Sequence, residues 1–317
     1  MNETQRALLA TLASGPVAGP EIAERLGVSR AAVWKQVETL REAGFEIEPT
    51  GEGYAVESVP EYGAAAVEFG LDAPFTVEYH DSLPSTNDRA RELAAGGESD
   101  VVVLADEQTG GRGRLSREWR SPSGGVWLSL LVRPPVPPTQ APLFTLAAAV
   151  AVVRAAEAAG VDAGIKWPND VVVRGDDGDR KLAGVLTEME GEADRVSWLV
   201  IGVGVNANVD AEPLPDRATS LRTEVGDVDR RAFVQRLLEA FEDLRGDPAS
   251  ILDAWRAHAV TLGQRVRVET PGGVVEGEAV DVTSPGALVV ATEDGERTVH
   301  AGDCEHLRPV DGRSGRV

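Results

Sequence analysis

Cysteine and lysine are both nearly absent from this 317-residue chain, which has one cysteine and only three lysines among its 31 basic residues. A lone cysteine, Cys304, cannot form an intramolecular disulfide, so we expect a cytoplasmic protein. The longest strongly apolar run, Leu143–Val153, is shorter than a bilayer requires, and the chain opens without a signal peptide. The sequence therefore predicts no association with a membrane.

Acidic residues outnumber basic ones by 52 to 31, which gives a net charge of −21. Such a surface repels polyanions, and salt screens that repulsion. Two explanations remain open: adaptation to a high-salt cytoplasm, or a codon usage that favours arginine over lysine. Any local excess of cations stands out against this background.

Residues 1–60 follow the pattern of a winged helix-turn-helix. The spacing predicts helices over Thr4–Ala13, Gly19–Leu26 and Arg30–Ala43, and strands over Phe45–Glu48 and Tyr54–Glu57. Gly27 ends the second helix and Ser29 is a good N-cap for the third. Because that third helix enters the DNA major groove in this fold, we assign DNA binding to Ser29, Arg30, Lys35 and Arg41.

The charge of this unit leaves its role open. Residues 1–60 hold five basic and nine acidic side chains, although the stretch from Ser29 to Arg41 is net positive. Phosphate contacts dominate DNA affinity, so binding by one copy would be weak and would gain from dimerisation. A helical module for protein interaction is the alternative.

The rest of the chain divides into a mixed region, 61–262, and a small β region, 263–317. In the mixed region, short apolar runs predict strands at 101–105, 126–132, 171–174, 182–188 and 197–205. Helices are predicted at 139–159, 230–245 and 248–258. Strands grouped between flanking helices favour an α+β fold over a strictly alternating parallel sheet. Turn signals every 9–14 residues predict a small all-β barrel or sandwich after residue 263.

The loop Gln108–Arg120 is the densest chemical signal. It carries Arg112, Arg114, Arg117 and Arg120 against one acid, Glu118. Glycines permit close backbone approach, and arginine forks suit phosphate or carboxylate oxygens. The loop therefore predicts an anionic ligand, with a solvated loop or a nucleic-acid contact as alternatives.

Two of the three lysines, Lys166 and Lys181, lie in a second cluster that runs from 166 to 184. Lysine offers a compact point charge that fits between two anions, where arginine offers a rigid fork. We therefore expect a functional role here, with surface ion pairing as the alternative. Asn169 and Asp170 supply oxygens that suit a phosphate-bound Mg²⁺.

Ser85, Thr86 and Asn87 precede an expected helix from Asp88 to Ala95. This trio fits an N-cap, and it also fits a site that binds a ligand carbonyl. Three other sites are disfavoured. No Walker A motif is present, Gly202–Asn206 is only half of a dinucleotide fingerprint, and His300, Cys304 and His306 lack a fourth metal ligand.

Together these motifs resemble the biotin protein ligases, specifically the bifunctional class that also represses biotin genes. The elements that carry the likeness are Ser85–Asn87, Gly111–Arg114, Lys166–Asp170 and Lys181–Gly184, in matching order and spacing along nearly the whole chain. The resemblance implies an α+β multidomain protein: a winged helix, a mixed α/β catalytic domain and a C-terminal SH3-like β barrel.

The resemblance also implies the activity. Biotin and ATP would form biotinyl-5′-AMP, and a lysine of a biotin carboxyl carrier protein would then accept the biotin. Expected partners are that carrier, operator DNA and a second copy of the chain in a ligand-linked dimer. The implied residues are Lys181 and Arg112 for catalysis; Ser85, Thr86, Asn87, Gln108, Arg112, Gly113, Arg114 and Lys181 for biotin; Gly111, Arg114, Arg117, Trp119, Lys166, Asn169, Asp170 and Asn206 for ATP or adenylate; and Asp170 for Mg²⁺.

Two rival functions stay open. A lipoate ligase also adenylates a carboxylate and transfers it to a carrier, although the winged helix and the arginine-rich loop favour biotin. A ligand-sensing repressor without catalysis is the other rival, and the paired lysines beside the glycine-rich loop speak against it.

Overall fold

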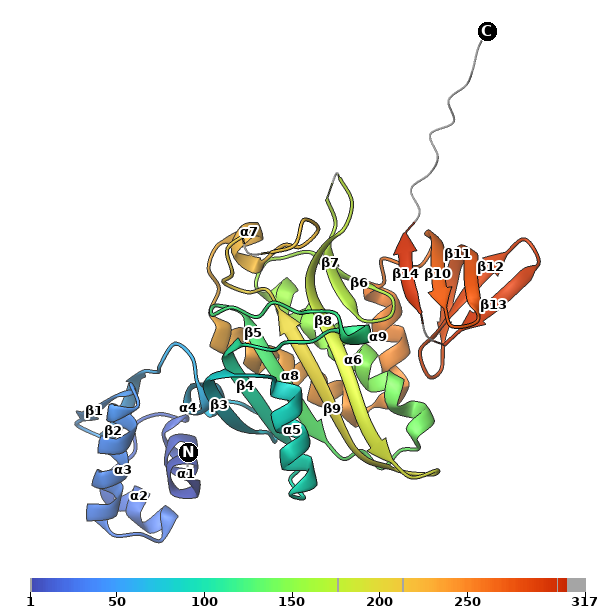
Figure 1. Cartoon of the computed structure of the whole chain (residues 1–317). Coiled ribbons are helices and arrows are strands. Elements are labelled where there is room, and N and C mark those ends of the chain that lie inside the picture. The colour runs from blue at the N-terminus through green and yellow to red at the C-terminus, as the bar shows by residue number, and fades with distance from the viewer. Residues whose placement is uncertain (1, 176, 213, 301, 307–317) are drawn as a thin grey trace.

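Three parts follow one another along the chain in the computed structural model, which describes residues 2–175, 177–212, 214–300 and 302–306 (Figure 1). The N-terminal module lies at one end, a large mixed sheet with its helices forms the middle, and a small sheet lies at the other end. This arrangement confirms the expected multidomain α+β fold. The predicted domain boundaries themselves stay predictions.

The N-terminal module has the predicted order of elements: α1 (Glu3–Leu12), α2 (Gly19–Leu26), α3 (Arg30–Glu42), β1 (Glu46–Thr50) and β2 (Gly53–Ser58). Local chemistry sets the ends of its helices. Gly27 ends α2 in the left-handed region at φ 65°, and Ser29 accepts a hydrogen bond from the Ala32 amide to begin α3. Val33, Val37 and Leu40 form the buried stripe of α3, which leaves its opposite face in solvent.

A short helix, α4 (Ala64–Glu68), joins the module to the middle of the chain. Its residues pack against both neighbours, with Ala65 on the core of the module and Val67 in the core of the central sheet. Glu68 ties the two together, because it pairs with Arg6 of α1 at 2.9 Å and accepts the amide of Val77 at 2.7 Å. Its side chain is only 8% exposed.

The central sheet has seven strands in the order β3-β4-β5-β9-β8-β7-β6. Only β3 and β4 run parallel, which confirms the preference for α+β over an alternating parallel sheet. The strands are β3 (Thr76–Leu83), β4 (Val101–Gln108), β5 (Val126–Val132), β6 (Ala163–Lys166), β7 (Asp170–Val173), β8 (Arg180–Gly191) and β9 (Val196–Val205). Sequence reasoning missed β3 and β6, because β3 is a polar edge strand and β6 has four residues.

Helices cover both faces of this sheet. α5 (Thr86–Ala95) packs on β4, β5 and β9, and its Ala90 and Ala94 join Val101, Val103 and Val200 in one apolar cluster. The other helices are α6 (Ala141–Ala158), α7 (Leu221–Val225), α8 (Arg230–Gly246) and α9 (Ile251–His258). α6 packs against α8, α9 and several strands to form the larger core. Short 3₁₀ turns at 138–140 and 248–250 precede α6 and α9, which therefore begin later than predicted.

Helix α6 corrects the estimate of the longest apolar segment. Residues 138–158 are long and apolar enough to cross a membrane, alone among the helices of the described chain, so the apolar segment is longer than the run Leu143–Val153. However, 72% of the apolar window is buried inside the protein. α6 therefore has the properties of a core helix.

The small C-terminal sheet has five antiparallel strands in the order β13-β12-β11-β10-β14. Its strands are β10 (Arg265–Thr270), β11 (Gly273–Thr283), β12 (Ala287–Thr292), β13 (Gly295–Val299) and β14 (Asp303–His306). The predicted turns fall between these strands, and the expected β region beyond residue 306 lies outside the described residues. The sheet shares an apolar cluster with the middle of the chain, and Trp167 donates its indole N–H to the Gly286 carbonyl at 3.0 Å.

Candidate functional site

Two adjoining cavities, of about 300 and 790 Å³, lie where the glycine-rich loop meets the central sheet. Both are lined by Trp119, Asp170 and Lys181. The smaller cavity brings together most of the predicted site residues: Ser85, Thr86, Asn87, Gln108, Arg112, Gly113, Arg114, Arg117 and Asn169. The larger adds Lys166 and Asn206. Gly111 is the one predicted ligand-site residue that lines neither cavity.

Lys181 stands at the junction of the two cavities. Its Nζ is 2.7 Å from Asp170 Oδ1 and 5.0 Å from the centre of the Trp119 ring. The β7–β8 hairpin produces this arrangement, because Asp170 begins one strand and Lys181 lies at the start of the other. The Lys181 side chain is about one-third exposed and lines both cavities, so it remains within reach of a ligand in either one.

The glycine-rich loop holds its arginines through contacts with three different parts of the chain. Arg112 pairs with Asp88 of α5, with 2.5 Å between its Nη2 and Oδ1. Arg114 donates to Asn169 Oδ1 at 3.1 Å and to the Gly302 carbonyl at 2.9 Å. The loop is thus attached both to α5 and to the segment that leads into β14.

Glycine is required at one position of this loop for steric reasons. A Cβ on Gly111 would lie 2.4 Å from the Trp119 carbonyl oxygen, closer than real contacts allow. A Cβ on Gly113 would meet nothing nearer than 3.7 Å. The expected need for close backbone approach therefore holds at Gly111, whereas Gly113 faces the smaller cavity without that constraint.

The start of α5 forms the far end of the smaller cavity. Ser85 is the N-cap, as its Oγ accepts the Asp88 amide, and the cap interpretation is confirmed. Gln108 Oε1 accepts the Thr86 amide at 2.8 Å and the Thr86 hydroxyl at 3.1 Å, while its Nε2 donates to Ser121. These polar groups are held in place by one another before any ligand arrives.

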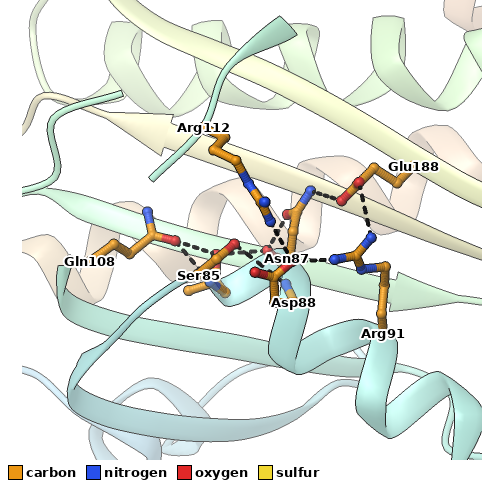
Figure 2. Close-up of polar contacts among 9 residues, drawn as sticks. Ser85, Asn87, Asp88, Arg91, Gln108, Arg112 and Glu188 are labelled. Atoms are coloured by element: carbon orange, nitrogen blue, oxygen red, sulfur yellow. Dashed lines mark hydrogen bonds and ion pairs between the residues drawn. The ribbon is translucent and has the colours of Figure 1, made fainter. Parts of the chain in front are cut away.

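Asn87 lies deeper than its neighbours and is 7% exposed. Its amide nitrogen donates to Glu188 Oε2 at 2.7 Å, and its Oδ1 is 2.6 Å from the hydroxyl of Ser129 (Figure 2). Both polar ends of the side chain therefore have protein partners. Glu188 lines the cavity and was missed by sequence reasoning, since it lies 101 residues from Asn87 in the chain.

Three glycines form a bare floor under the smaller cavity: Gly184 of β8 and Gly202 and Gly204 of β9. A Cβ on Gly202 would lie 2.3 Å from Asn87 Oδ1, and one on Gly204 would lie 2.6 Å from Trp119 Nε1. The sequence analysis had weighed Gly202–Asn206 only as half of a dinucleotide fingerprint. The structure indicates another reason for glycine at 202 and 204, because it lets Asn87 and Trp119 approach strand β9 closely.

The larger cavity includes residues of the C-terminal region, which sequence reasoning had not placed at the site. His306 and Gln264 line it together with Lys166 and Asp179. His306 Nδ1 is 2.9 Å from Asp179 Oδ2, and its Nε2 is 3.0 Å from the Thr261 hydroxyl. Burial, together with the positive charge of Lys166, lowers the pKa of His306, so this imidazole is neutral at pH 7.

Asn169 and Asn206 act as buried supports at the rim. Asn169 donates to the Val185 carbonyl at 2.7 Å, and Asn206 donates to the Thr219 carbonyl at 2.9 Å. Among the described residues, no three His, Cys, Asp or Glu side chains gather as ligands of a metal ion. Among the described carboxylates of the β7–β8 hairpin, only Asp170 lines both cavities. It is paired with Lys181.

The predicted DNA-binding residues differ in their surroundings. Arg30, Trp34 and Lys35 lie exposed on α3, and Trp34 is 58% exposed. Arg41 instead donates to the Ile47 carbonyl of β1 and to Glu38. Arg41 therefore braces the wing, whereas Arg30 and Lys35 face solvent.

Family comparisons match three segments of the chain in order. An HTH domain matches residues 4–63, the Biotin/lipoate A/B protein ligase family matches 79–206, and the Biotin protein ligase C terminal domain matches 261–307.

Relatives agree with this order. The bifunctional ligase/repressor BirA of Bacillus subtilis is 38% identical over 309 residues, which cover 91% of this chain and 93% of that protein. The biotin--[acetyl-CoA-carboxylase] ligase of Mycobacterium tuberculosis is 37% identical over 238 residues, covering 71% and 86%. Among solved structures, the biotin protein ligase of Aquifex aeolicus in complex with biotin and ATP aligns with a TM-score of 0.60 at 25% identity, covering 74% of this chain and 99% of that one.

Proposed function

Because the chain belongs to the biotin protein ligases of the bifunctional ligase/repressor type, we propose that Lys181 is the residue on which its chemistry turns. The enzyme activates biotin with ATP as biotinyl-5′-AMP and transfers it to a lysine of a biotin carboxyl carrier protein. The observation that carries the assignment is the position of Lys181, which borders both cavities at once. One cavity would hold biotin and the other the nucleotide.

Charge placement is the main task in both steps. The biotin carboxylate attacks the α-phosphate of ATP and releases pyrophosphate, and the amine of the carrier lysine then attacks the mixed anhydride and releases AMP. Neither step needs a nucleophile from the enzyme. A fixed ammonium between carboxylate and phosphate stabilises the negative charge that builds up between them. Lys181 would exchange Asp170 for these ligand oxygens.

The glycine-rich loop is assigned to retention of the adenylate. Arg112 and Arg114 supply forks for its carboxyl and phosphate oxygens, and Arg117 and Trp119 would lie over it. The contacts of Arg114 with Asn169 and Gly302 support this role, because they draw the loop across the cavities. Gly111 stays assigned to the adenylate through its backbone, and the close approach of the Trp119 carbonyl explains why this position lacks a side chain.

The polar end of the smaller cavity suits the ureido ring of biotin. Ser85, Thr86 and Gln108 present hydroxyl and amide groups there, and the Ser129 hydroxyl lies within hydrogen-bond distance of both Thr86 Oγ1 and Asn87 Oδ1. Lys166, Asn169 and Asn206 are assigned to the nucleotide side. Mg²⁺ would arrive with ATP and take Asp170 as a protein ligand, since this ion is commonly held by one or two carboxylates plus substrate phosphates.

DNA binding is assigned to the exposed face of α3, with Arg30 and Lys35 as phosphate contacts and Ser29 at the helix start. Two cations per copy are few, so binding would require a dimer that places two such helices on a palindromic operator. Adenylate that orders the loop would favour that dimer. Sedimentation at high salt, with and without biotin plus ATP, tests this linkage, and a monomer under both conditions would reject it.

Exchange of labelled pyrophosphate into ATP tests the enzymatic proposal. We expect exchange that depends on biotin, and competition with lipoate would separate the two acids as substrates. Exchange that depends on lipoate instead would favour the rival ligase. No exchange with either acid would leave a ligand-sensing repressor. A cytoplasmic location suits a ligase whose ATP and carrier substrates are found there.

A further inference from the structure

Two carboxylates are linked to the cavity that we assign to biotin in different ways (Figure 2). Glu188 lines it, as Glu118 and Asp170 also do, whereas Asp88 pairs with Arg112 of its lining. Asp88 Oδ1 bonds both Arg112 of the glycine-rich loop and Arg91 of α5. Arg91 extends to Glu188 as well, with 3.5 Å between Nη1 and Oε1. Arg91 is therefore the one side chain of this group in contact with both acids.

This arrangement answers an electrostatic problem. Biotin enters as an anion, and two uncompensated carboxylates beside its site would repel it electrostatically. Arg112 alone cannot neutralise both, because its guanidinium reaches Asp88 and not Glu188 in this structure. A second cation, placed between the acids, leaves Arg112 free to be shared with the ligand.

We propose that Arg91 is a positioning residue for biotin. It neutralises Asp88 and Glu188 together, prevents Asp88 from holding Arg112 exclusively, and fixes the Glu188 carboxylate that orients Asn87. The inference rests on the proposed function, since it takes the smaller cavity as the biotin site. Arg91 is not among the described residues that line this cavity, so it acts by positioning residues that do.

Arg89 provides a matched control on the same helix. It is also an arginine paired with two acids, bonding Glu78 at 2.6 Å and Glu92 at 2.8 Å, and its exposed fraction is 35% against 41% for Arg91. Its partners lie on β3 and on α5 itself, and none of them lines either cavity. Loss of an ion pair from α5 is common to both variants, whereas loss of charge beside the biotin cavity is specific to Arg91.

The experiment measures pyrophosphate exchange at varied biotin and varied ATP for the full chain. We expect Arg91→Gln to raise the KM for biotin about tenfold, corresponding to about 1.4 kcal/mol, while kcat at saturating biotin and the KM for ATP change less than about twofold. Arg89→Gln should leave all three unchanged, and Arg91→Lys should retain most of the wild-type KM. Added salt should shrink the defect, because it screens the exposed acids.

A second variant separates positioning from folding. Asp88→Asn added to Arg91→Gln removes the acid that would otherwise capture Arg112, so it should restore at least half of the lost affinity on a logarithmic scale. The proposal is overturned if Arg91→Gln matches Arg89→Gln, if kcat falls together with the melting temperature, or if Asp88→Asn rescues nothing. Biotin-dependent exchange by the wild-type chain tests the proposed function separately.

Discussion

Helix α3 of the N-terminal module and the glycine-rich loop both carry basic side chains in an acidic chain. The arginines of the two segments have different kinds of partner. In α3, Arg41 is tied to the wing through the Ile47 carbonyl, a bond that no ligand replaces. In the loop, Arg112 is held by Asp88, a carboxylate that resembles the groups a ligand would offer. In α3, Arg41 stabilises the fold. In the loop, Arg112 pairs with a carboxylate that a ligand anion would replace.

The difference indicates how each surface meets its ligand. The cavities are surrounded by Arg112, Arg114, Arg117, Lys166 and Lys181, so a single small anion meets several cations at once. The exposed face of α3 offers Arg30 and Lys35 to a polyanion, in a module with more acids than bases. Ligation is therefore expected of one copy, and operator binding of two.

Lys181→Ala should have the largest effect. Removing one preorganised donor at the reacting atoms costs about 3 kcal/mol of transition-state stabilisation, or roughly a hundredfold in rate. Pyrophosphate exchange measures it, and Lys166→Ala serves as the comparison on the nucleotide side. Unchanged adenylate formation by Lys181→Ala would remove this residue from its assigned role.

Arg112→Ala should come next, through retention of the intermediate. A hydrogen bond to a charged group contributes about 1.5–3 kcal/mol, so release of the adenylate should accelerate at least about tenfold. The dissociation rate of preformed biotinyl-5′-AMP gives the answer. A rate equal to that of the wild type would argue that Arg112 stays with Asp88 in the complex.

Within the DNA module, Lys35→Ala and Arg41→Ala should separate binding from folding. Lys35→Ala removes a phosphate contact, which weakens DNA binding and lowers the salt-dependence slope by about 1. Arg41→Ala should instead destabilise the module by about 1 kcal/mol, because it leaves the Ile47 carbonyl without its donor. Binding to operator-length DNA at several salt concentrations, and unfolding by urea, distinguish the two. Equal effects of the two variants in both assays would show that Lys35 and Arg41 do not differ in role.

The smallest effect is expected at Glu78, whose pair with Arg89 is purely structural. The hydrogen bond from Arg89 lowers the pKa of Glu78 below its usual 4.5, against the opposing effect of burial. A carboxyl with a depressed folded-state pKa stabilises the fold above its unfolded pKa, and this contribution is lost as pH falls through the folded value. Glu78→Gln should therefore cost less than about 1 kcal/mol at pH 7 and less still below pH 4. Urea unfolding at both pH values checks this, and a constant difference would exclude the linkage.

Local signals explain which parts of the fold were predictable. Ser29, Gly27 and the stripe of α3 act over a few residues, and each did in the structure what the sequence indicated. The strands at 171–174 and 182–188 were likewise predicted, and in the structure they pair as neighbours, which brings Asp170 close to Lys181. Edge strand β3 was missed because its exposed face carries polar residues instead of an apolar pattern.

The unpredicted parts of the site depend on contacts between distant residues. Asn87 and Glu188 are 101 positions apart, and Arg114 and Gly302 are 188 apart. No periodicity encodes such pairs, because packing of the whole domain determines them. His306 is suggested by the sequence only as a metal ligand, although the fold of the last strand places it at the larger cavity.

The glycine floor on β8 and β9 also bears on how ligases of this kind diverge. Because the glycines have no side chain, the cavity reaches down to the strand backbone. A single methyl group at position 202 or 204 would therefore displace Asn87 or Trp119. One-base changes from glycine to alanine could thus reshape which vitamin-like acid is accepted while the arginines and Lys181 keep their places. Positions 202 and 204 are therefore the first to vary when such a ligase is engineered to accept an unnatural label.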